Sequence, residues 1–336
     1  MGNLFDKEAA SCLLNNLKKE YDIFAPKRYP GDGAYSDTDT IRYGIIESFE
    51  EIIWDRKSDY SFKEALLPIS DTIMYFTQSS TKLPEPRKKR LLFLRSCDIH
   101  ALKRLDEIYL KNGFSDYYYQ SVRENAKFVL MGCADSFNSC FCVSMGTNQT
   151  DSYDAYAYPE TNGLYFEFNN EDLKTAAKAS EAPEKSFPKR FVTVNEEQVC
   201  PPENLPENIG QHELWKEYSG RCIGCGRCNF VCPTCTCFTM QDIFYRDNEN
   251  AGERRRVWAS CQVDGYSDIA GGMSFRKVQG ERMRFKVLHK IYNYKNRFGY
   301  HMCVGCGRCE NICPEYISYI HCLHKLSKIG GKENDQ

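Results

Sequence analysis

The fold is decided by the stretch Cys222-Ile-Gly-Cys225-Gly-Arg-Cys228-Asn-Phe-Val-Cys232-Pro233. A second copy follows as Cys303-Val-Gly-Cys306-Gly-Arg-Cys309-Glu-Asn-Ile-Cys313-Pro314, so both stretches have the spacing C-x2-C-x2-C-x3-C-P. A 4Fe–4S cluster needs one thiolate on each of its four irons, and three cysteines at two-residue gaps can reach three irons from one tight loop. The glycines between them let the backbone approach the cluster closely. We therefore predict two 4Fe–4S clusters.

The fourth ligand of each cluster can come from its own motif or from the other one. In two-cluster ferredoxins the fourth cysteine of each motif ligates the other cluster. Such crossed ligation gives two ligand sets: Cys222, Cys225, Cys228 and Cys313 for cluster 1, and Cys303, Cys306, Cys309 and Cys232 for cluster 2. A pair of zinc sites is the competing interpretation, but structural zinc usually shows separate C-x2-C pairs, and four cysteines in eleven residues crowd a tetrahedral ion. Two adjacent clusters indicate electron transfer.

Composition and charge exclude several other classes of protein. The chain has 336 residues, 42% hydrophobic and 27% charged, which is typical of a folded protein of two domains. Its net charge of -2 argues against a nucleic-acid binder. We find no secretory signal and no apolar stretch of membrane-spanning length, so we expect a cytoplasmic protein without a membrane segment. With 18 cysteines in a reducing compartment, metal ligation is the first explanation to test.

The charge divides the chain into two parts. Residues 1–219 hold 26 basic and 35 acidic residues, whereas residues 220–329 hold 17 basic and 9 acidic residues and most of the cysteines. We predict an α+β protein with four parts: an N-terminal α/β domain (1–199), a linker and entry helix (200–219), a mostly helical dicluster domain (220–329) and a polar tail (330–336). Expected helices span 4–21, 99–111, 170–180, 286–294 and 317–328. Expected strands span 90–96 and 128–131, with a hairpin over 156–168.

A third cluster is predicted in the first part of the chain. Cys97 and Cys133 each end a predicted strand, and Cys140 and Cys142 follow soon afterwards. If the strands are parallel neighbours, their carboxyl ends lie at one edge of the sheet, where α/β proteins usually bind ligands. Four thiolates converging there would hold a third 4Fe–4S cluster; the alternatives are buried cysteines without ligand function or a zinc site.

The remaining cysteines and the basic runs receive simpler interpretations. Cys235, Cys237 and Cys261 are predicted to be non-ligand thiols beside a cluster, because no fourth ligand accompanies them. Cys12 and Cys322 are expected to pack in helices, and Cys200 has no assigned role. The runs Arg254–Arg256 and Arg282–Lys286 are interpreted as a solvated basic face. The chain has no G-x-G-x-x-G after a strand and no P-loop.

Two resemblances extend this interpretation. Seventy residues separate Cys232 from Cys303, and this long insertion with flanking helices resembles the alpha-helical ferredoxin type found in iron–sulfur subunits of fumarate reductases, in which ligation is crossed. The stretches Arg221–Asp242, Gly252–Cys261 and Met302–Ile317 resemble the iron–sulfur electron-transfer subunits of anaerobic sulfite reductases, to which sulfhydrogenase beta subunits are related. The resemblance implies a cytoplasmic complex. In it a flavin subunit takes electrons from NADH, an iron–sulfur subunit like this chain relays them, and a siroheme subunit reduces sulfite to sulfide.

The resemblance also implies what this chain lacks. Flavin, NAD and siroheme are expected on partner subunits, and no substrate-reducing catalytic residue is expected here. Two alternatives stay open: an electron-transfer subunit feeding a hydrogenase, and a catalytic reductase that binds its own substrate at the first-domain cluster.

Overall fold

The computed structural model describes residues 1–35 and 37–331 and divides the chain into two compact units. Unit 1 comprises Met1–Pro68, Leu83–Phe137 and Thr147–Val194; unit 2 comprises Ile69–Lys82, Asn138–Gly146 and Asn195–Gln336. Two short segments from the first half of the chain therefore belong to the cysteine-rich unit. Of the predicted polar tail, residues 332–336 lie outside the described residues.

Unit 1 is built on a mixed sheet of eight strands within the described residues, in the order β10-β1-β9-β8-β7-β6-β2-β3. The central strands β2, β6, β7 and β8 run parallel to one another, while the two ends of the sheet are antiparallel. The strand bounds are β1 Gly2–Phe5, β2 Tyr21–Tyr29, β3 Thr40–Ile45, β6 Lys89–Leu94, β7 Ala126–Met131, β8 Ala155–Glu160, β9 Gly163–Phe168 and β10 Glu184–Lys185.

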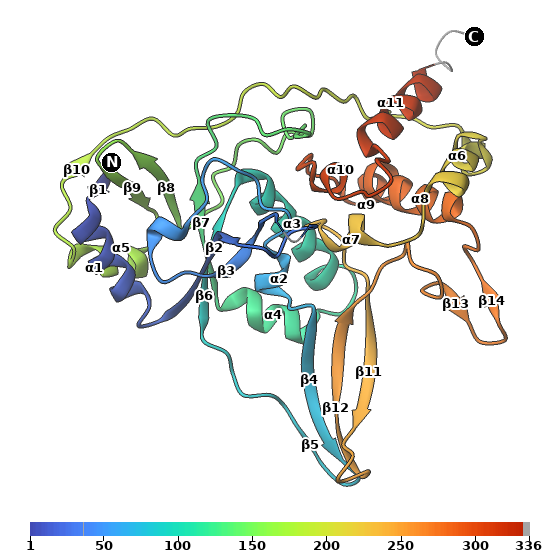
Figure 1. Cartoon of the computed structure of the whole chain (residues 1–336), viewed down its shortest axis with the longest axis horizontal. Coiled ribbons are helices and arrows are strands. Elements are labelled where there is room, and N and C mark those ends of the chain that lie inside the picture. Colours follow the sequence, from blue (N-terminus) through green and yellow to red (C-terminus); the bar gives the residue numbers. More distant parts are fainter. Residues whose placement is uncertain (36, 332–336) are drawn as a thin grey trace. The chain divides into compact units, whose positions relative to one another are not determined.

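Short helices connect these strands. Helices α1 and α5 lie together beside β1 and β9 (Figure 1), and Leu13, Leu17 and Leu173 from the two helices join Phe93 and Phe166 from the sheet in one buried core. Burying such side chains is the main stabilising contribution of this layer. The helix bounds in unit 1 are α1 Lys7–Leu17, η1 Phe49–Glu51, α2 Lys63–Leu66, α3 Ser96–Leu110, α4 Tyr117–Glu124 and α5 Glu171–Lys178.

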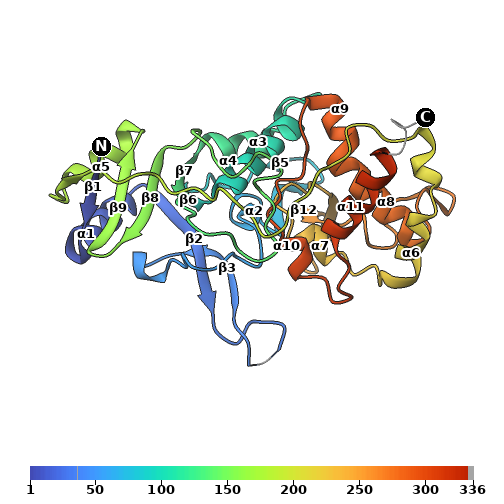
Figure 2. The same cartoon turned by 90° about the horizontal axis from the view of Figure 1, so that it is seen from above.

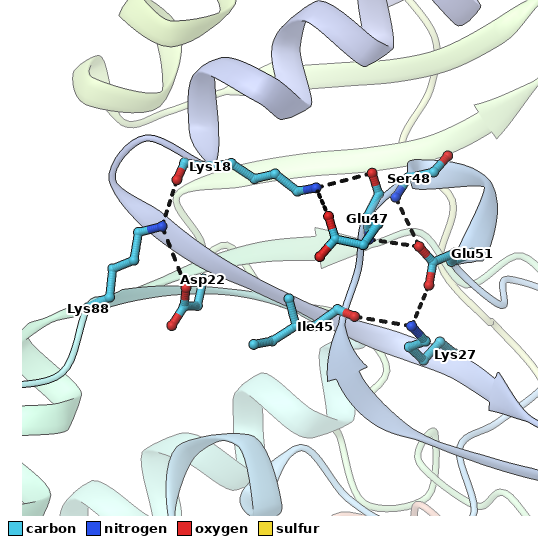
Figure 3. A network of polar contacts seen from close by, with 8 residues as sticks. All are labelled: Lys18, Asp22, Lys27, Ile45, Glu47, Ser48, Glu51 and Lys88. Carbon is cyan, nitrogen blue, oxygen red and sulfur yellow. Dashed lines mark hydrogen bonds and ion pairs between the residues drawn. The ribbon is translucent and has the colours of Figure 1, made fainter.

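A network of polar contacts ties the loop after β3 to β2 (Figure 3). The carboxylate of Glu51 accepts hydrogen bonds from the backbone N–H groups of Glu47 (2.7 Å) and Ser48 (3.1 Å) and also pairs with Lys27. Lys27 in turn donates to the carbonyl of Ile45 at 3.2 Å. The capping box formed by Ser48 and Glu51 satisfies the first N–H groups of η1, which fixes this turn at the sheet edge.

Most of the elements expected in unit 1 are confirmed. The strands at 90–96 and 128–131 are β6 and β7, which are parallel neighbours, and the hairpin over 156–168 is β8–β9. Two details differ. Residues 2–5 form a strand rather than the start of the first helix, because they pair with β9. The helix expected over 99–111 begins earlier, because α3 starts at Ser96; Asp98 lies in its first turn, buried and within hydrogen-bond distance of Tyr43.

Unit 2 surrounds the two cysteine motifs with helices. Trp215, Val287, Ile291 and Leu323 form its core with neighbouring apolar side chains. The expected helices over 286–294 and 317–328 are confirmed as parts of α8–η3 and α11. The helix bounds are η2 Glu207–Gln211, α6 Leu214–Arg221, α7 Arg227–Phe230, α8 Gln279–Leu288, η3 His289–Asn293 (one π-helical turn), α9 Tyr294–Phe298, α10 Arg308–Asn311 and α11 Tyr319–Gly330.

Unit 2 also contains strands that the sequence pattern did not indicate. The order is β11-β12-β4-β5, with β4 Ser70–Thr77, β5 Thr81–Lys82, β11 Phe238–Phe244 and β12 Ala251–Trp258; a separate pair consists of β13 Asp268–Ile269 and β14 Met273–Ser274. Most of β11 is exposed, and its apolar–polar alternation breaks at Gln241-Asp242, so it lacks the regular pattern that marks a half-buried strand. Cross-strand pairing supports it instead: Arg254 donates two hydrogen bonds, of 2.6 and 2.7 Å, to the carboxylate of Asp242.

No described helix has both the length and the apolar character needed to cross a lipid bilayer.

Candidate iron–sulfur centres

The two cysteine motifs adopt the same local backbone. In the first, α6 ends at Arg221, directly before Cys222. A loop follows, and Gly226 in the left-handed conformation precedes the short helix α7, which carries Cys228. In the second, Gly307 takes the same role for α10, which carries Cys309. The φ angles of Gly226 and Gly307 are 75° and 66°, a region that glycine enters without strain. The sequence repeat is therefore a structural repeat, and α7 and α10 lie side by side (Figures 1 and 2).

Gly305 in the second motif is fixed by close packing as well as by its backbone. It has φ 65°, and a Cβ added there would lie 2.5 Å from the carbonyl oxygen of Phe141 and 2.7 Å from the backbone nitrogen of Cys142. Phe141 also donates its N–H to the carbonyl of Gly305 at 2.8 Å. The segment around Phe141 thus packs directly on the second cysteine loop.

Replacing Gly305 with alanine is expected to destabilise unit 2. The clash involves backbone atoms that cannot rotate away, and the left-handed conformation costs a further 1–2 kcal/mol or so. We expect a total loss of about 2–3 kcal/mol, which lowers the apparent melting temperature by roughly 4–12 °C. Gly299→Ala is the matched control, since Gly299 also has positive φ (82°) but nothing within 4 Å of the added Cβ. Equal shifts for the two variants in a thermal melt would contradict the packing argument.

Cysteines from both motifs line one pocket. Cys222, Cys225 and Cys228 of the first motif share it with Cys313 and Cys309 of the second, together with Met283 and Tyr319. The backbone N–H of Gly224 donates to Cys222 Sγ at 3.4 Å, and that of Ile317 donates to Cys313 Sγ at 3.3 Å. Such N–H···S bonds stabilise the thiolate form of a cluster ligand. The geometry brings Cys313 to the first three cysteines, which is the arrangement that crossed ligation requires.

Besides burial, repulsion from neighbouring thiolates contributes to the raised pKa of Cys222. Burial raises the pKa of Cys222, and the nearby thiols of Cys228, Cys225 and Cys313 raise it further, against the N–H of Gly224. Four adjacent thiols cannot all lose their protons unless a cationic centre compensates their charge. The chemistry of this donor set therefore fits a 4Fe–4S cluster. Within residues 1–35 and 37–331, no three His, Cys, Asp or Glu side chains are arranged to hold a single metal ion.

The second set of thiols is more deeply buried than the first. Burial raises the pKa of Cys303 to about 12, and the thiols of Cys306 and Cys232 add to this effect. Burial likewise raises the pKa of Cys309, with further contributions from Cys306 and Cys303. Cys232 of the first motif is thus grouped with the three cysteines of the second. In the other set, by contrast, Cys225 is exposed to solvent.

The interpretation of residues 282–286 as a solvated basic face is wrong. Arg282 and Lys286 are buried, with 4% and 5% of their surfaces exposed, and Lys290 one turn later is 3% exposed. Arg282 pairs with Asp264, whereas the two lysines lie among the cysteines. The four-residue spacing of 282, 286 and 290 places them in one stripe of a helix, beside the apolar stripe of Met283, Val287 and Ile291. This spacing was the sequence signal that could have revealed them.

Cys235, Cys237 and Cys261 lie close to the motifs and to one another. Cys261 donates a hydrogen bond to Cys237, which lowers the pKa of Cys237 to about 6 against the effect of burial. Asn229 on α7 donates to Cys261 Sγ at 3.1 Å. Cys235 is hydrogen-bonded to Cys232. The sequence did not reveal the pairing of Cys237 with Cys261, and their assignment as non-ligands stays a prediction.

The four cysteines of the predicted third cluster are divided between the two units. In unit 1, Cys97 lies in the first turn of α3 after β6, and Cys133 follows β7. In unit 2, Cys140 and Cys142 are buried; Cys140 Sγ lies 3.7 Å from the carbonyl oxygen of Cys306. The expected parallel pairing of β6 and β7 is confirmed, and the third cluster itself stays a prediction.

Residues 221–317 match the family model described as a 4Fe-4S dicluster domain. The chain thus consists of a sheet-rich α/β region followed by a 4Fe–4S dicluster domain, the fold class expected from its sequence.

Two curated proteins that are named as beta subunits of oxidoreductases are similar to the chain. It is 28% identical to sulfhydrogenase 2 subunit beta of Pyrococcus furiosus, over 94% of this chain and 95% of that protein. It is 25% identical to the F420-dependent formate dehydrogenase subunit beta of Methanocaldococcus jannaschii, over 37% of this chain and 24% of that protein. No solved structure matches it. The chain therefore carries a 4Fe–4S dicluster domain and is related to these iron–sulfur oxidoreductase beta subunits.

Proposed function

We propose that the chain relays electrons through two 4Fe–4S clusters held by crossed ligation, between two partner subunits of a cytoplasmic oxidoreductase. The observation that carries this proposal is the pocket in which Cys222, Cys225 and Cys228 meet Cys313. Cluster 1 takes these four ligands, and cluster 2 takes Cys303, Cys306, Cys309 and Cys232. A third cluster on Cys97, Cys133, Cys140 and Cys142 belongs to the same relay.

Each cluster, when bound, accepts and donates one electron. The residues of this chain hold the clusters and control access to them. Apolar side chains such as Met283 and Ile317 line the pocket of the first set and limit contact with water. Cys225 is exposed, and the neighbouring Ile223 is 60% exposed. Because electron transfer needs close approach rather than substrate binding, this exposed edge is where a partner protein can exchange electrons with cluster 1.

The resemblance to the iron–sulfur electron-transfer subunits of anaerobic sulfite reductases supports a specific reaction. In this version a flavin subunit oxidises NADH, this chain carries the electrons, and a siroheme subunit reduces sulfite to sulfide. The motif-bearing stretches Arg221–Asp242 and Met302–Ile317 carry that resemblance.

A sulfhydrogenase is the second candidate, and a specific observation favours it. The similarity to sulfhydrogenase 2 subunit beta extends over 94% of this chain, far beyond the cysteine motifs. In this version the same relay exchanges electrons with a hydrogenase subunit. Purifying the native complex through a tag on this chain separates the candidates: NADH-dependent sulfite reduction with a siroheme absorption band supports the first, and hydrogen uptake with an electron-accepting dye supports the second.

The isolated chain is expected to carry electrons without catalysing either end of the reaction. It should bleach near the visible cluster band when a strong chemical reductant is added anaerobically, because the clusters accept the electrons directly. It should neither oxidise NADH nor reduce sulfite, because those sites belong to its partners. Steady NADH-dependent sulfite reduction by the purified, reconstituted single chain would refute the relay proposal.

A further inference from the structure

Two buried lysines lie one helical turn apart in unit 2. Lys286 is in the last turn of α8, and Lys290 is in the π-helical turn η3 that continues it. Only 5% and 3% of their surfaces are exposed. Lysine is almost never buried to this degree unless its charge is compensated, since removing an ammonium group from water is costly. The compensating groups must therefore lie within unit 2.

The groups around Lys290 are mainly sulfur atoms. Its Nζ donates to Thr234 Oγ1 at 2.7 Å and lies 3.6 Å from Met302 Sδ. Thr234 Oγ1 in turn lies 3.4 Å from Cys232 Sγ, the ammonium group is also hydrogen-bonded to Cys235, and Met302 directly precedes Cys303 in the chain. Under crossed ligation, Cys232 and Cys303 both belong to cluster 2. The ammonium group of Lys290 therefore faces the second ligand set.

Lys286 lies between the two ligand sets. It lines the pocket in which Cys228 of the first motif and Cys309 of the second motif also lie. Cys228 is a ligand of cluster 1 and Cys309 a ligand of cluster 2. The two lysines are therefore not equivalent, because Lys290 faces only the ligands of cluster 2, whereas Lys286 faces ligands of both clusters.

The backbone of Lys290 is tied to the second motif as well. Its carbonyl accepts hydrogen bonds from the N–H groups of Met302 at 2.9 Å and Cys303 at 3.3 Å. A π-helical turn is rare and is often retained at functional sites. Here the π-helical turn contains Lys290, whose carbonyl and side chain both contact the start of the second cysteine loop.

We propose that Lys286 and Lys290 are the internal counter-cations of the two clusters and raise their reduction potentials, with Lys290 acting on cluster 2 and Lys286 acting on both. This proposal rests on the crossed ligation given under Proposed function. A cubane held by four thiolates is an anion, and its one-electron reduction adds another negative charge. A fixed positive charge nearby favours the reduced form, and the effect is strong because the site is buried.

The test uses the full chain, reconstituted with iron and sulfide without oxygen and titrated with a redox mediator while each cluster is followed by EPR. Lys290→Met keeps the length of the side chain and removes its charge. We expect the ratio of reduced to oxidised cluster 2 at a fixed potential to fall about tenfold, a shift of about 59 mV for one electron, with cluster 1 little changed. Lys286→Met should lower the ratio for both clusters.

Three further variants distinguish the effect of the lysine charge from the effect of the side-chain shape. Lys290→Arg keeps the charge and should stay close to the wild-type potential. Lys290→Gln keeps a donor for Thr234 without the charge and should behave like Lys290→Met. Lys328→Met removes an exposed lysine of α11 and should change neither cluster. If Met and Gln variants lose the iron of cluster 2 while the Arg variant retains it, the requirement for a positive charge is likewise supported.

Three outcomes would contradict the proposed role of the lysines or the assignment of Lys290 to cluster 2. Full iron content with less than a twofold change in the Met and Gln variants would overturn the proposal, and so would loss of cluster 2 in all three variants at Lys290. Equal shifts of both clusters in Lys290→Met would overturn the assignment of Lys290 to cluster 2. A wild-type chain that binds no iron is a different result, because it refutes the relay itself rather than the role of the lysines.

Discussion

The double variant Cys222→Ala/Cys313→Ala is expected to lose one 4Fe–4S cluster and to keep the other intact. The pocket places Cys313 with the cysteines of the first motif, so the two substitutions remove two ligands from the same cluster. Alanine supplies no replacement ligand. Iron analysis should show about four fewer irons per chain, and the EPR signal of the remaining cluster should persist without the broadening caused by its neighbour.

The comparison variant is Cys303→Ala/Cys313→Ala, which removes the same number of ligands. Under crossed ligation it takes one ligand from each cluster, so both EPR signals should be altered. Uncrossed ligation predicts the reverse pattern for the two double variants. A chain in which Cys303→Ala/Cys313→Ala spares one cluster, while Cys222→Ala/Cys313→Ala disturbs both, contradicts the crossed arrangement.

The variant Cys140→Ser/Cys142→Ser is expected to remove about four irons and to leave the two dicluster signals in place. Cys140 and Cys142 are buried, and clustered thiolates repel one another unless a metal centre compensates their charge; a third cluster supplies that compensation. Iron content and sulfide content of the anaerobically purified chain measure the effect. Cys12→Ser is the control for loss of an exposed cysteine.

A second double variant distinguishes loss of the third cluster from an indirect effect on the second cysteine motif. Cys140 lies 3.7 Å from the carbonyl of Cys306, so its replacement could also disturb cluster 2 through packing. Cys97→Ser/Cys133→Ser changes unit 1 alone. Loss of the same irons in both double variants supports the third cluster, whereas an unchanged iron count in Cys97→Ser/Cys133→Ser shows that these cysteines are not ligands.

The cysteine motifs could be interpreted from the sequence because their chemistry is local. Their spacing determines which sulfur atoms one loop can present, and the glycines determine where the backbone can turn. Likewise, the buried strands β6 and β7 and the hairpin β8–β9 follow from apolar runs and turn residues. Each of these features depends on residues that are close together in the chain.

The features that the sequence did not reveal depend on contacts between distant residues. The strand β11 is mostly exposed and is defined by its pairing with β12. Lysine is usually found on the solvated surface, so the sequence did not show that Lys286 and Lys290 are buried. Only the packing of α8 and η3 among the cysteine loops shows it. The proximity of Cys237 to Cys261 also depends on tertiary packing.

The most direct test of the relay is spectroscopy of the purified full chain under anaerobic conditions. We expect a brown protein with at least about eight irons and eight acid-labile sulfides per chain. After chemical reduction, its EPR spectrum should show two neighbouring clusters whose signals are broadened by magnetic interaction. A colourless protein that binds zinc, holds no acid-labile sulfide and gives no signal on reduction would contradict the central claim.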